Sequence, residues 1–434
     1  GVVSMETSKA RPSDGFARLL LIASVLTLVP RVVWALVVPF EPMSDSNAYF
    51  NFASTIVSGG GYGWEPNEPT AYWAVGPSGI YAAFFYVFGV GKLAVVLANM
   101  LASVSFAIGM VVLAERWFSR RAAWAAAWLS ALWPTMVMYT TVLSSELFFA
   151  AMLVQTLVVI DPQRGVSWQR SVAVGPLVAA MAMVRPTGLL IPAAVAGIRW
   201  LRGGGFVRPI GAGLVTTAVM LVCIAPWTYR NYQVLGEPVL ISTNGGPNFW
   251  MGNNPETTGA YMPLPDRVTG MSETERASVL KDEAVAYIRA EPVAFAKRTA
   301  IKMVRQHERE TIGVGWNEDG LRTRFGEWII NPLKAASTGF WLATLAGAFA
   351  GIVMLLRSDG FWKTLTHPCV MLWGYFATVH AITVIQDRYH LQWSPMVMLL
   401  ATLPIAAIVT KLRGAPVTAD GPPDSGDFAA SEPA

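Results

Sequence analysis

The chain alternates long apolar runs with short polar stretches. The first run extends from residue 19 to residue 40 and is interrupted only by Arg31, two prolines and two small polar residues. A helix of about 20 apolar residues is long enough to cross the hydrocarbon core of a bilayer. The runs and the breakers between them predict ten spans, near residues 17–39, 93–114, 122–138, 144–160, 171–184, 186–199, 209–228, 336–356, 366–385 and 393–411.

Lysine and arginine predict which side of the membrane each connection occupies. Lys9, Arg11 and Arg18 precede the first span, whereas the polar stretch at residues 41–77 contains no Lys or Arg. Because basic residues are retained in cytoplasmic loops, the N-terminus is predicted to be cytoplasmic. The later basic residues fall on the same side, which favours an even number of spans and a cytoplasmic C-terminus: Arg116, Arg120, Arg121, Arg164, Arg170, Arg199, Arg202, Arg208, Arg357, Lys363, Lys411 and Arg413.

Two predicted outer segments, residues 40–91 and 229–335, are long. The first contains SDSNAYFNFASTIVSG, with Ser44 as the expected helix cap, and the short apolar helix PSGIYAAFFYVFG. Both helices are expected to lie in the outer interface. The second segment opens with the strand-like, turn-rich PVLISTNGGPNFWMGNNPETTGAY and becomes helical at a capping box of Ser272 and Glu275, and Pro292 starts a further helix.

These patterns predict an all-α polytopic membrane protein of about ten transmembrane helices. Interfacial helices occupy its first outer loop, and its second outer loop is mixed but mainly helical. Residues 1–412 would form one transmembrane domain. Residues 413–434 are rich in Pro, Gly, Ser and Ala, which predicts a disordered cytoplasmic tail. The first 15 residues lack the apolar core of a cleaved signal peptide.

Composition supports a membrane protein and excludes two other classes. Hydrophobic residues make up 53% of the chain and charged residues only 14%, against about 25% in soluble domains. The net charge of +4 comes from basic residues scattered through short loops, so no nucleic-acid partner is expected. The two cysteines lie inside apolar runs, which excludes a disulfide framework or a CxxC metal motif.

Ionisable and basic side chains stand at several span ends that are predicted to face outward. They are Asp45, Glu146, Arg185, Arg230, Asp387, Arg388 and His390. Such groups beside an apolar slab are functional candidates, although simple interfacial anchoring explains any single one equally well. A carboxylate can act as a general base, and arginine binds phosphate oxygens bidentately. A substrate with a lipid tail and a phosphate head would fit this surface.

Several short motifs appear in a recognisable order. They are Asp45 after the first span, PSGIYAAFFYVFG, VLSSELFF, VRPTG, PWTYRNY running into ISTNGGPNFWMGNNP, and DRYHLQWSP before the last span. In this order the chain resembles, up to about Arg413, the GT-C superfamily of integral membrane glycosyltransferases. It looks most like bacterial members related to protein O-mannosyltransferases and to the lipid A aminoarabinose transferase.

The resemblance implies an inverting transfer of a sugar from a polyprenyl-phosphate donor to a lipid, glycan or protein acceptor. The reaction would take place at the outer face of the bacterial plasma membrane. No cofactor is required, and a divalent cation is doubtful because Ser46 and Asn47 stand where many relatives carry a second acid. By position in the family motifs, Asp45 would be the general base and Glu146 the second catalytic acid.

The remaining site residues are assigned to the two substrates. Arg185, Arg388 and Arg230 would bind the donor phosphate. Tyr72, Asn244, Asn248, Asn253 and His390 would contact substrate, since asparagines both donate and accept hydrogen bonds. An interfacial aromatic belt explains Tyr72 as readily.

Two further questions stay open. The basic helix with Lys297, Arg298, Lys302 and Arg305 either meets anionic groups or is a solvated face. A transporter or lipid flippase is the rival function. Transporters favour inverted repeats and ionisable groups at the bilayer midplane. The sequence shows no repeat and no midplane carboxylate, and Arg31 in the first span is the exception.

Overall fold

The computed structural model describes residues 14–412, so the predicted disordered tail at 413–434 lies outside the described residues. Across residues 14–412 the regular structure is helical, with two isolated bridges and no strand. Five helices of this range are long and apolar enough to cross a membrane: α1 (Asp14–Val37), α4 (Lys92–Trp117), α11 (Val207–Leu235), α17 (Ile330–Asp359) and α20 (Ser394–Leu412). The chain is therefore a helical, multi-pass membrane protein, as predicted.

Shorter helices complete the bundle, and each predicted span coincides with at least one helix. These are α5 (Arg120–Leu132), α6 (Pro134–Met138), α7 (Glu146–Ile160), α8 (Trp168–Ala173), α9 (Gly175–Val184), α10 (Ile191–Leu201), α18 (Phe361–Leu365) and α19 (Pro368–Ile382). Short 3-10 turns are η1 (Tyr139–Thr141), η2 (Pro186–Leu190), η3 (Asp266–Val268), η4 (Glu327–Ile329) and η5 (Tyr389–Gln392). That the shorter helices also cross the membrane stays a prediction.

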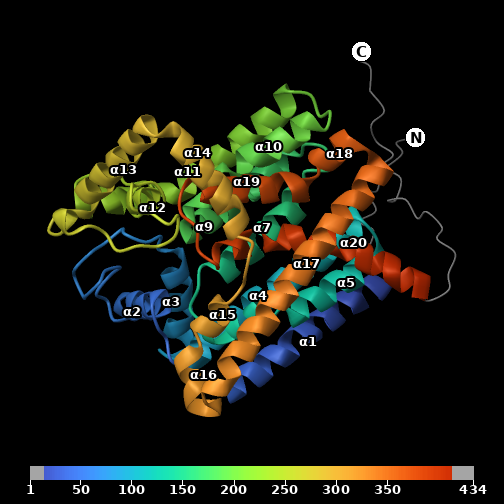
Figure 1. Ribbon diagram of the computed structural model, residues 1–434, viewed down its shortest axis with the longest axis horizontal. Coiled ribbons are helices and arrows are strands. Elements are labelled where there is room, and N and C mark those ends of the chain that lie inside the picture. Colours follow the sequence, from blue (N-terminus) through green and yellow to red (C-terminus); the bar gives the residue numbers. More distant parts are fainter. Residues whose placement is uncertain (1–13, 413–434) are drawn as a thin grey trace, which may run out of the picture.

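Close packing of small residues holds the long helices together. α17 and α20 run side by side, and α4 packs against both α5 and α7 (Figure 1). A Cβ atom at Gly351 of α17 would lie 2.2 Å from the carbonyl oxygen of Leu400 in α20. Only glycine therefore allows this approach, in the manner usual for membrane helices, which pack closely through small residues.

Proline ends two helices of the bundle. Trp133 precedes Pro134, and Arg185 precedes Pro186. A residue before proline is pushed out of the helical region, and both residues are extended, with φ and ψ of −60° and 109° at Trp133 and −147° and 125° at Arg185. The helix axis is thus broken where both side chains meet polar partners.

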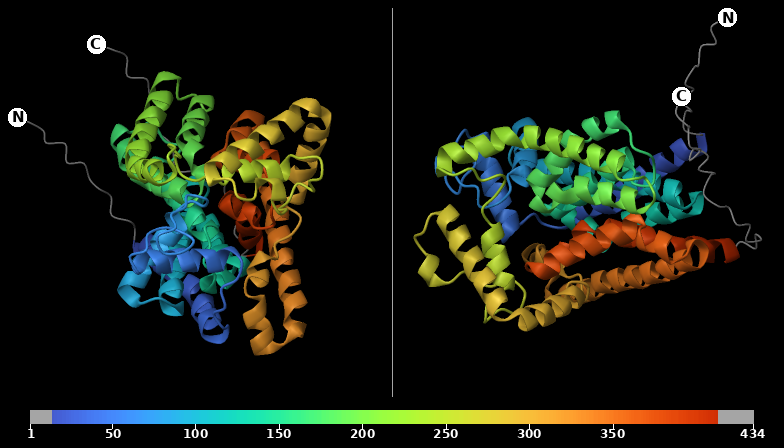
Figure 2. Two further views of the ribbon diagram at one scale, coloured as in Figure 1. Left: turned by 90° about the vertical axis from the view of Figure 1, so that its left-hand side faces the viewer. Right: turned by 90° about the horizontal axis from the view of Figure 1, so that it is seen from above.

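The two outer segments form a second, mostly helical layer. It contains α2 (Asp45–Val57), α3 (Gly76–Phe88), α12 (Gly245–Gly252), α13 (Glu273–Ala290), α14 (Pro292–Arg305), α15 (Ile312–Gly315) and α16 (Glu318–Phe325). Figure 2 shows α13 and α14 at the end of the molecule opposite α18. The predicted helix starts at Ser272 and Pro292 are confirmed, since the Ser272 hydroxyl accepts a hydrogen bond from the Glu275 amide and α14 begins at Pro292.

Two local predictions about the outer segments are wrong. The strand-like stretch after Pro238 contains α12 instead, and its backbone pairs with residues 71–72 through only two hydrogen bonds, from the amides of Thr243 and Asn244. Two bonds are too few to build a sheet. Ser44 does not cap α2 with its side chain, because its positive φ of 52° is far from the extended conformation of a capping residue.

Candidate active site

A cavity of about 1080 Å³ opens between the outer segments and the ends of the bundle helices. Its wall is built from the start of α2, the turn between α9 and η2, the start of α12, the end of α19, and the loop before η5. Six of the predicted site residues line it, namely Asp45, Tyr72, Arg185, Asn244, Asn248 and Arg388. Segments more than 300 residues apart in the sequence therefore share one site.

Asp45 and Arg388 form an ion pair on the cavity wall. Asp45 is the first residue of α2, where the free amides and the helix dipole favour a negative charge. Its Oδ2 accepts a hydrogen bond from Nη2 of Arg388. The Asp45 side chain remains 24% exposed while that of Arg388 is 9% exposed, so the carboxylate keeps access to the cavity.

Glu146 lies beneath this pair and joins it to Arg185. It is the first residue of α7 and is fully buried. Its Oε1 accepts from Nη1 of Arg185 at 2.7 Å and lies 3.7 Å from Nη1 of Arg388. Nη1 of Arg185 also donates to the Ser145 hydroxyl at 2.7 Å. Two carboxylates and two guanidinium groups thus form one chain of contacts, in the order Asp45, Arg388, Glu146, Arg185.

Aromatic rings hold both guanidinium groups in orientation. The Arg388 guanidinium lies 4.6 Å from the ring centre of Trp316 and 5.6 Å from that of Tyr389. The Arg185 guanidinium lies 4.9 Å from the same Tyr389 ring. Because cations are attracted to the faces of aromatic rings, Tyr389 and Trp316 fix the planes of the two groups. Neither ring was predicted, since Trp and Tyr are common at every membrane interface.

The charges of the site shift the acidity of groups around it. Burial lowers the pKa of Arg388, but the carboxylates of Glu146 and Asp45 outweigh burial and hold its pKa well above the ordinary value. Burial raises the pKa of Tyr49, which lines the same cavity, and Asp45 and Glu146 raise it further. Arg388 therefore stays cationic, and Tyr49 stays a neutral phenol that can donate a hydrogen bond.

The polar wall facing these charges carries three further predicted residues. The Tyr72 ring lies under the Arg276 guanidinium at 5.5 Å, and burial raises the Tyr72 pKa. The Asn244 amide donates its backbone N–H to the Tyr72 carbonyl at 3.1 Å, which brings the two outer segments together. Asn248 lies one helical turn further along α12. These side chains offer hydrogen-bonding groups around a cavity large enough for a sugar.

Part of the cavity wall is apolar. Leu189 and Leu190 from η2 face Tyr375 and Val379 from α19. Leu190 is 58% exposed on the outside of the described structure. The cavity wall therefore combines the cationic Arg185 with apolar side chains from η2 and α19.

Arg230 does not line the cavity, contrary to its predicted contact with the donor phosphate. Its guanidinium donates to the carbonyl oxygens of Thr70 at 2.7 Å and Tyr62 at 2.8 Å, and lies over the Trp227 ring at 4.7 Å. Its hydrogen-bonding capacity is therefore used to hold the first outer loop on α11.

Asn253 and His390 are also outside the cavity. The Asn253 amide is fully buried and donates to the carbonyls of Phe249 at 3.0 Å and Ile382 at 2.8 Å, so it clamps α12 onto α19. His390 is fully buried and its Nε2 lies 2.9 Å from Oε2 of Glu310. Asp387, expected in the same ionic group, accepts from the backbone amide of Thr311 at 3.2 Å. Each is held by structural contacts.

Lys302 differs from the other basic residues of its helix. It is fully buried, so it belongs neither to a solvated face nor to a surface that meets anionic groups. Its Nζ donates to the carbonyls of Thr383 at 2.8 Å and Gly252 at 3.1 Å, and burial lowers its pKa to about 8. The lysine ties α14 to the ends of α12 and α19. Lys297 of the same helix is exposed, and the sequence did not predict that one lysine would be buried and the other exposed.

No group of three or more His, Cys, Asp or Glu side chains that could hold a metal ion occurs in residues 14–412. The carboxylate oxygen Oε2 of Glu146 has no hydrogen-bond partner within the described range. Asp45 and Glu146 are both engaged by arginine.

No protein-family model matches the chain. No curated protein matches its sequence either. Solved structures do match its fold. The archaeal oligosaccharyltransferase AglB from Archaeoglobus fulgidus, in complex with an inhibitory peptide and a dolichol-phosphate, aligns with a TM-score of 0.56 at 12% identity, over 92% of this chain and 51% of that one.

ArnT from Cupriavidus metallidurans, bound to undecaprenyl phosphate, aligns with a TM-score of 0.54 at 16% identity, over 91% of this chain and 60% of that one. The chain thus spans about half the length of AglB. Both proteins are GT-C glycosyltransferases, so the resemblance inferred from the motifs is confirmed for the fold.

Proposed function

We propose that the chain is a membrane glycosyltransferase that moves a sugar, with inversion, from a polyprenyl-phosphate-linked donor to an acceptor hydroxyl. The observation that carries this proposal is the meeting of Asp45, Arg185 and Arg388 on the wall of one cavity. A carboxylate that reaches the cavity can accept a proton, and two oriented guanidinium groups can hold a phosphate. The GT-C fold supports the same conclusion.

The donor would contact both the charged and the apolar parts of the cavity wall. Its phosphate would meet Arg185 and Arg388, which bind phosphate oxygens through charge-assisted hydrogen bonds. Its prenyl chain would follow Leu189, Leu190 and Val379 toward the lipid. That ArnT is bound to undecaprenyl phosphate and AglB to dolichol-phosphate supports a lipid phosphate as the ligand of this fold.

The transfer would be a single displacement at the anomeric carbon. The acceptor hydroxyl gives its proton to Asp45 while its oxygen forms the new bond to that carbon. The bond between the carbon and the phosphate oxygen breaks, and the electron pair leaves with the phosphate. Attack from the face opposite the phosphate inverts the anomeric centre. Arg185 and Arg388 stabilise the charge that develops on the leaving phosphate.

Release of Asp45 from Arg388 would free its Oδ2 to accept the proton. An incoming phosphate brings the negative charge that lets Arg388 exchange partners without leaving a buried cation unpaired. Glu146 would stay in place, because it is fully buried and accepts from Arg185 at 2.7 Å. We assign Glu146 the role of positioning both arginines, and Asp45 the role of general base.

The other cavity residues would contact the sugars. Tyr72, Asn244 and Asn248 line the cavity, and asparagine amides suit hydroxyl groups because they donate and accept. The acceptor would be a lipid, glycan or protein presented at the outer face of a bacterial plasma membrane. The arrangement of basic residues in the sequence supports cytoplasmic termini and an outward cavity.

The substitution Asp45→Asn tests this proposal. In proteoliposomes that contain the donor and the acceptor, we expect the transfer rate to fall about 10²- to 10⁴-fold, the range for loss of a general base. Asp266→Asn serves as the matched control, because Asp266 is an exposed acid of the second outer loop. Transfer at the wild-type rate by folded Asp45→Asn would refute the general-base role. Movement of the lipid across liposomes without any acceptor would favour a flippase instead.

A further inference from the structure

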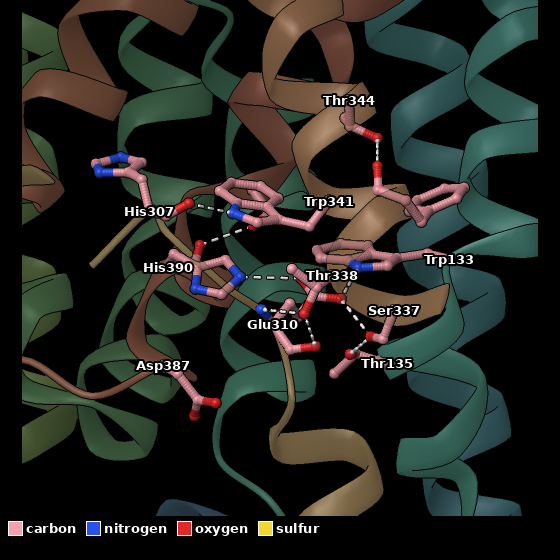
Figure 3. A network of polar contacts seen from close by, with 12 residues as sticks. Trp133, Thr135, His307, Glu310, Ser337, Thr338, Trp341, Thr344, Asp387 and His390 are labelled. Carbon is pink, nitrogen blue, oxygen red and sulfur yellow. Dashed lines mark hydrogen bonds and ion pairs between the residues drawn. The ribbon is translucent and has the colours of Figure 1, made fainter. Parts of the chain in front are cut away.

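A fully buried acid and histidine lie close to the cavity without lining it. Glu310 belongs to the segment between α14 and α15, and His390 belongs to η5. Both side chains are 0% exposed, and Nε2 of His390 lies 2.9 Å from Oε2 of Glu310 (Figure 3). The transfer mechanism uses neither residue. Such a pair is costly to bury, so its contacts indicate what it stabilises.

Glu310 joins three parts of the fold. Its Oε1 accepts from Nε1 of Trp133 at 2.8 Å and from the hydroxyl of Ser337 at 3.3 Å. Its backbone amide donates to the Thr338 hydroxyl at 3.3 Å. The carboxylate is therefore anchored to the proline break after α5 and to α17, two elements of the bundle. In residues 14–412 the only ion pair of Glu310 is with His390.

His390 is oriented by the same surroundings. Its ring centre lies 4.3 Å from that of Trp341 on α17. Because the Glu310 carboxylate accepts, Nε2 carries the donated proton. Nδ1 has no hydrogen-bond partner within the described residues. The hydrogen bond to Glu310 is thus the directional contact that fixes this ring and the start of η5.

The residues that precede His390 connect this pair to the ion pair on the cavity wall. Asp387 accepts from the Thr311 amide, so the segments on either side of the pair are joined twice. Arg388 lies between Asp387 and His390 in the sequence. Its guanidinium rests on Trp316, which comes from the same outer segment as Glu310. The Glu310–His390 contact therefore fixes both the backbone that carries Arg388 and the segment that carries the ring beneath it.

We propose that Glu310 and His390 are positioning residues that hold Arg388 in place to bind the phosphate of the lipid substrate. This inference rests on the proposed function for the identity of the ligand. A displacement of about 1 Å at a reacting group can reduce a rate about 10²-fold, so a small rotation of η5 is enough to matter. The bundle supplies the rigid support, and Arg388 lines the cavity.

The test compares two lipids that differ only in the phosphate. Binding of undecaprenyl phosphate and of undecaprenol is measured on the full chain in nanodiscs. His390→Phe keeps a flat ring beside Trp341 and removes the donated hydrogen bond, whereas His390→Gln retains a donor. We expect His390→Phe to weaken undecaprenyl phosphate binding about tenfold or more and to leave undecaprenol binding unchanged. His390→Gln should restore binding to within about threefold of the wild type.

The matched control is His367→Phe. His367 is also buried and its ring stacks on Phe118, but it precedes α19 at the end away from the cavity. We expect His367→Phe to lower the apparent unfolding temperature without changing the preference for phosphate. If both variants weaken the two lipids equally, or if His390→Gln restores nothing, the positioning role is refuted.

A double-mutant cycle separates this inference from the proposed function. If wild-type protein binds undecaprenol as tightly as undecaprenyl phosphate, the phosphate ligand is wrong, and the lipid comparison says nothing of His390. The unfolding temperatures of His390→Phe, Arg388→Gln and the double variant then decide. Non-additive shifts support the positioning of Arg388, because an Arg388 that is already displaced makes fewer stabilising contacts for its substitution to remove. Additive shifts refute it, whichever ligand the cavity takes.

Discussion

Arg388 and Arg230 are used in opposite ways. Arg388 faces the cavity and pairs with the carboxylates of Asp45 and Glu146. Arg230 turns away from the cavity and donates to the backbone carbonyls of Tyr62 and Thr70. Both side chains also lie over aromatic rings. The partners, rather than the arginine or its surroundings, distinguish the two positions.

The type of partner decides whether a ligand can enter. The carbonyls of Tyr62 and Thr70 belong to the folded loop, and an anion cannot take their place without releasing that loop. The carboxylate of Asp45 is itself an anion on a partly exposed side chain. A phosphate can take its place beside Arg388, so the guanidinium keeps an anionic partner. A binding arginine is therefore one whose partner is exchangeable.

Of the two arginine variants, Arg388→Gln should have the larger effect on transfer. Loss of one group that stabilises developing charge costs about 10²- to 10³-fold in rate. Arg230→Gln should leave the rate per folded molecule unchanged and destabilise the protein by about 2 kcal/mol, since hydrogen bonds to charged groups contribute about that much. Initial transfer rates and apparent unfolding temperatures measure the two effects. If folded Arg388→Gln and folded Arg230→Gln lost the same transfer rate, the distinction between a binding and a structural arginine would be refuted.

Lys302 extends the comparison to a buried cation with only structural partners. We expect Lys302→Met to cost roughly 1–3 kcal/mol of stability, because the carbonyls of Gly252 and Thr383 lose their donor. The folded-state pKa of about 8 lies below the ordinary 10.5. Between these values the unfolded chain binds more protons than the folded chain, so stability rises with pH.

The pH dependence of unfolding distinguishes Lys302 from Arg388 and Arg230. Relative to Lys302→Met, the wild type should gain stability as the pH rises from about 8 to 10.5, the range set by the two pKa values. Unfolding of both proteins is followed over that range in the same detergent. A constant difference between them would show that Lys302 does not lose its proton in the folded state.

Hydropathy predicted the helices well because membrane-spanning segments satisfy their backbone hydrogen bonds internally. Their positions depend on local sequence, so the helices appear where the apolar runs are. The shape of the second outer segment was harder to predict. The stretch containing α12 has small and polar residues that suit either a turn or a helix, and its contacts with residues 71–72 and with α19 select the helix.

The site could be predicted only in part for a related reason. Asp45, Arg185 and Arg388 were found because each stands at a helix end or a proline break, which are local features. Arg230, Asn253 and Lys302 each donate to at least one backbone carbonyl distant in sequence, and the residue pattern does not reveal which carbonyls will be such partners. Trp316 and Glu310 were missed because the outer segment that carries them reads as a polar loop.

Asn248 in α12 and Asn253 directly after it provide the test with the smallest expected effect. Asn248 lines the cavity, whereas Asn253 is buried and holds the Ile382 carbonyl at 2.8 Å. We expect Asn248→Ala to raise the KM for donor or acceptor a few-fold, because one neutral hydrogen bond contributes about 1 kcal/mol. Asn253→Ala should lower the unfolding temperature and leave KM unchanged, since it leaves a buried carbonyl without a donor. If Asn253→Ala instead raises KM while the unfolding temperature stays constant, the amide contacts substrate and the cavity extends further along α12 than its walls indicate.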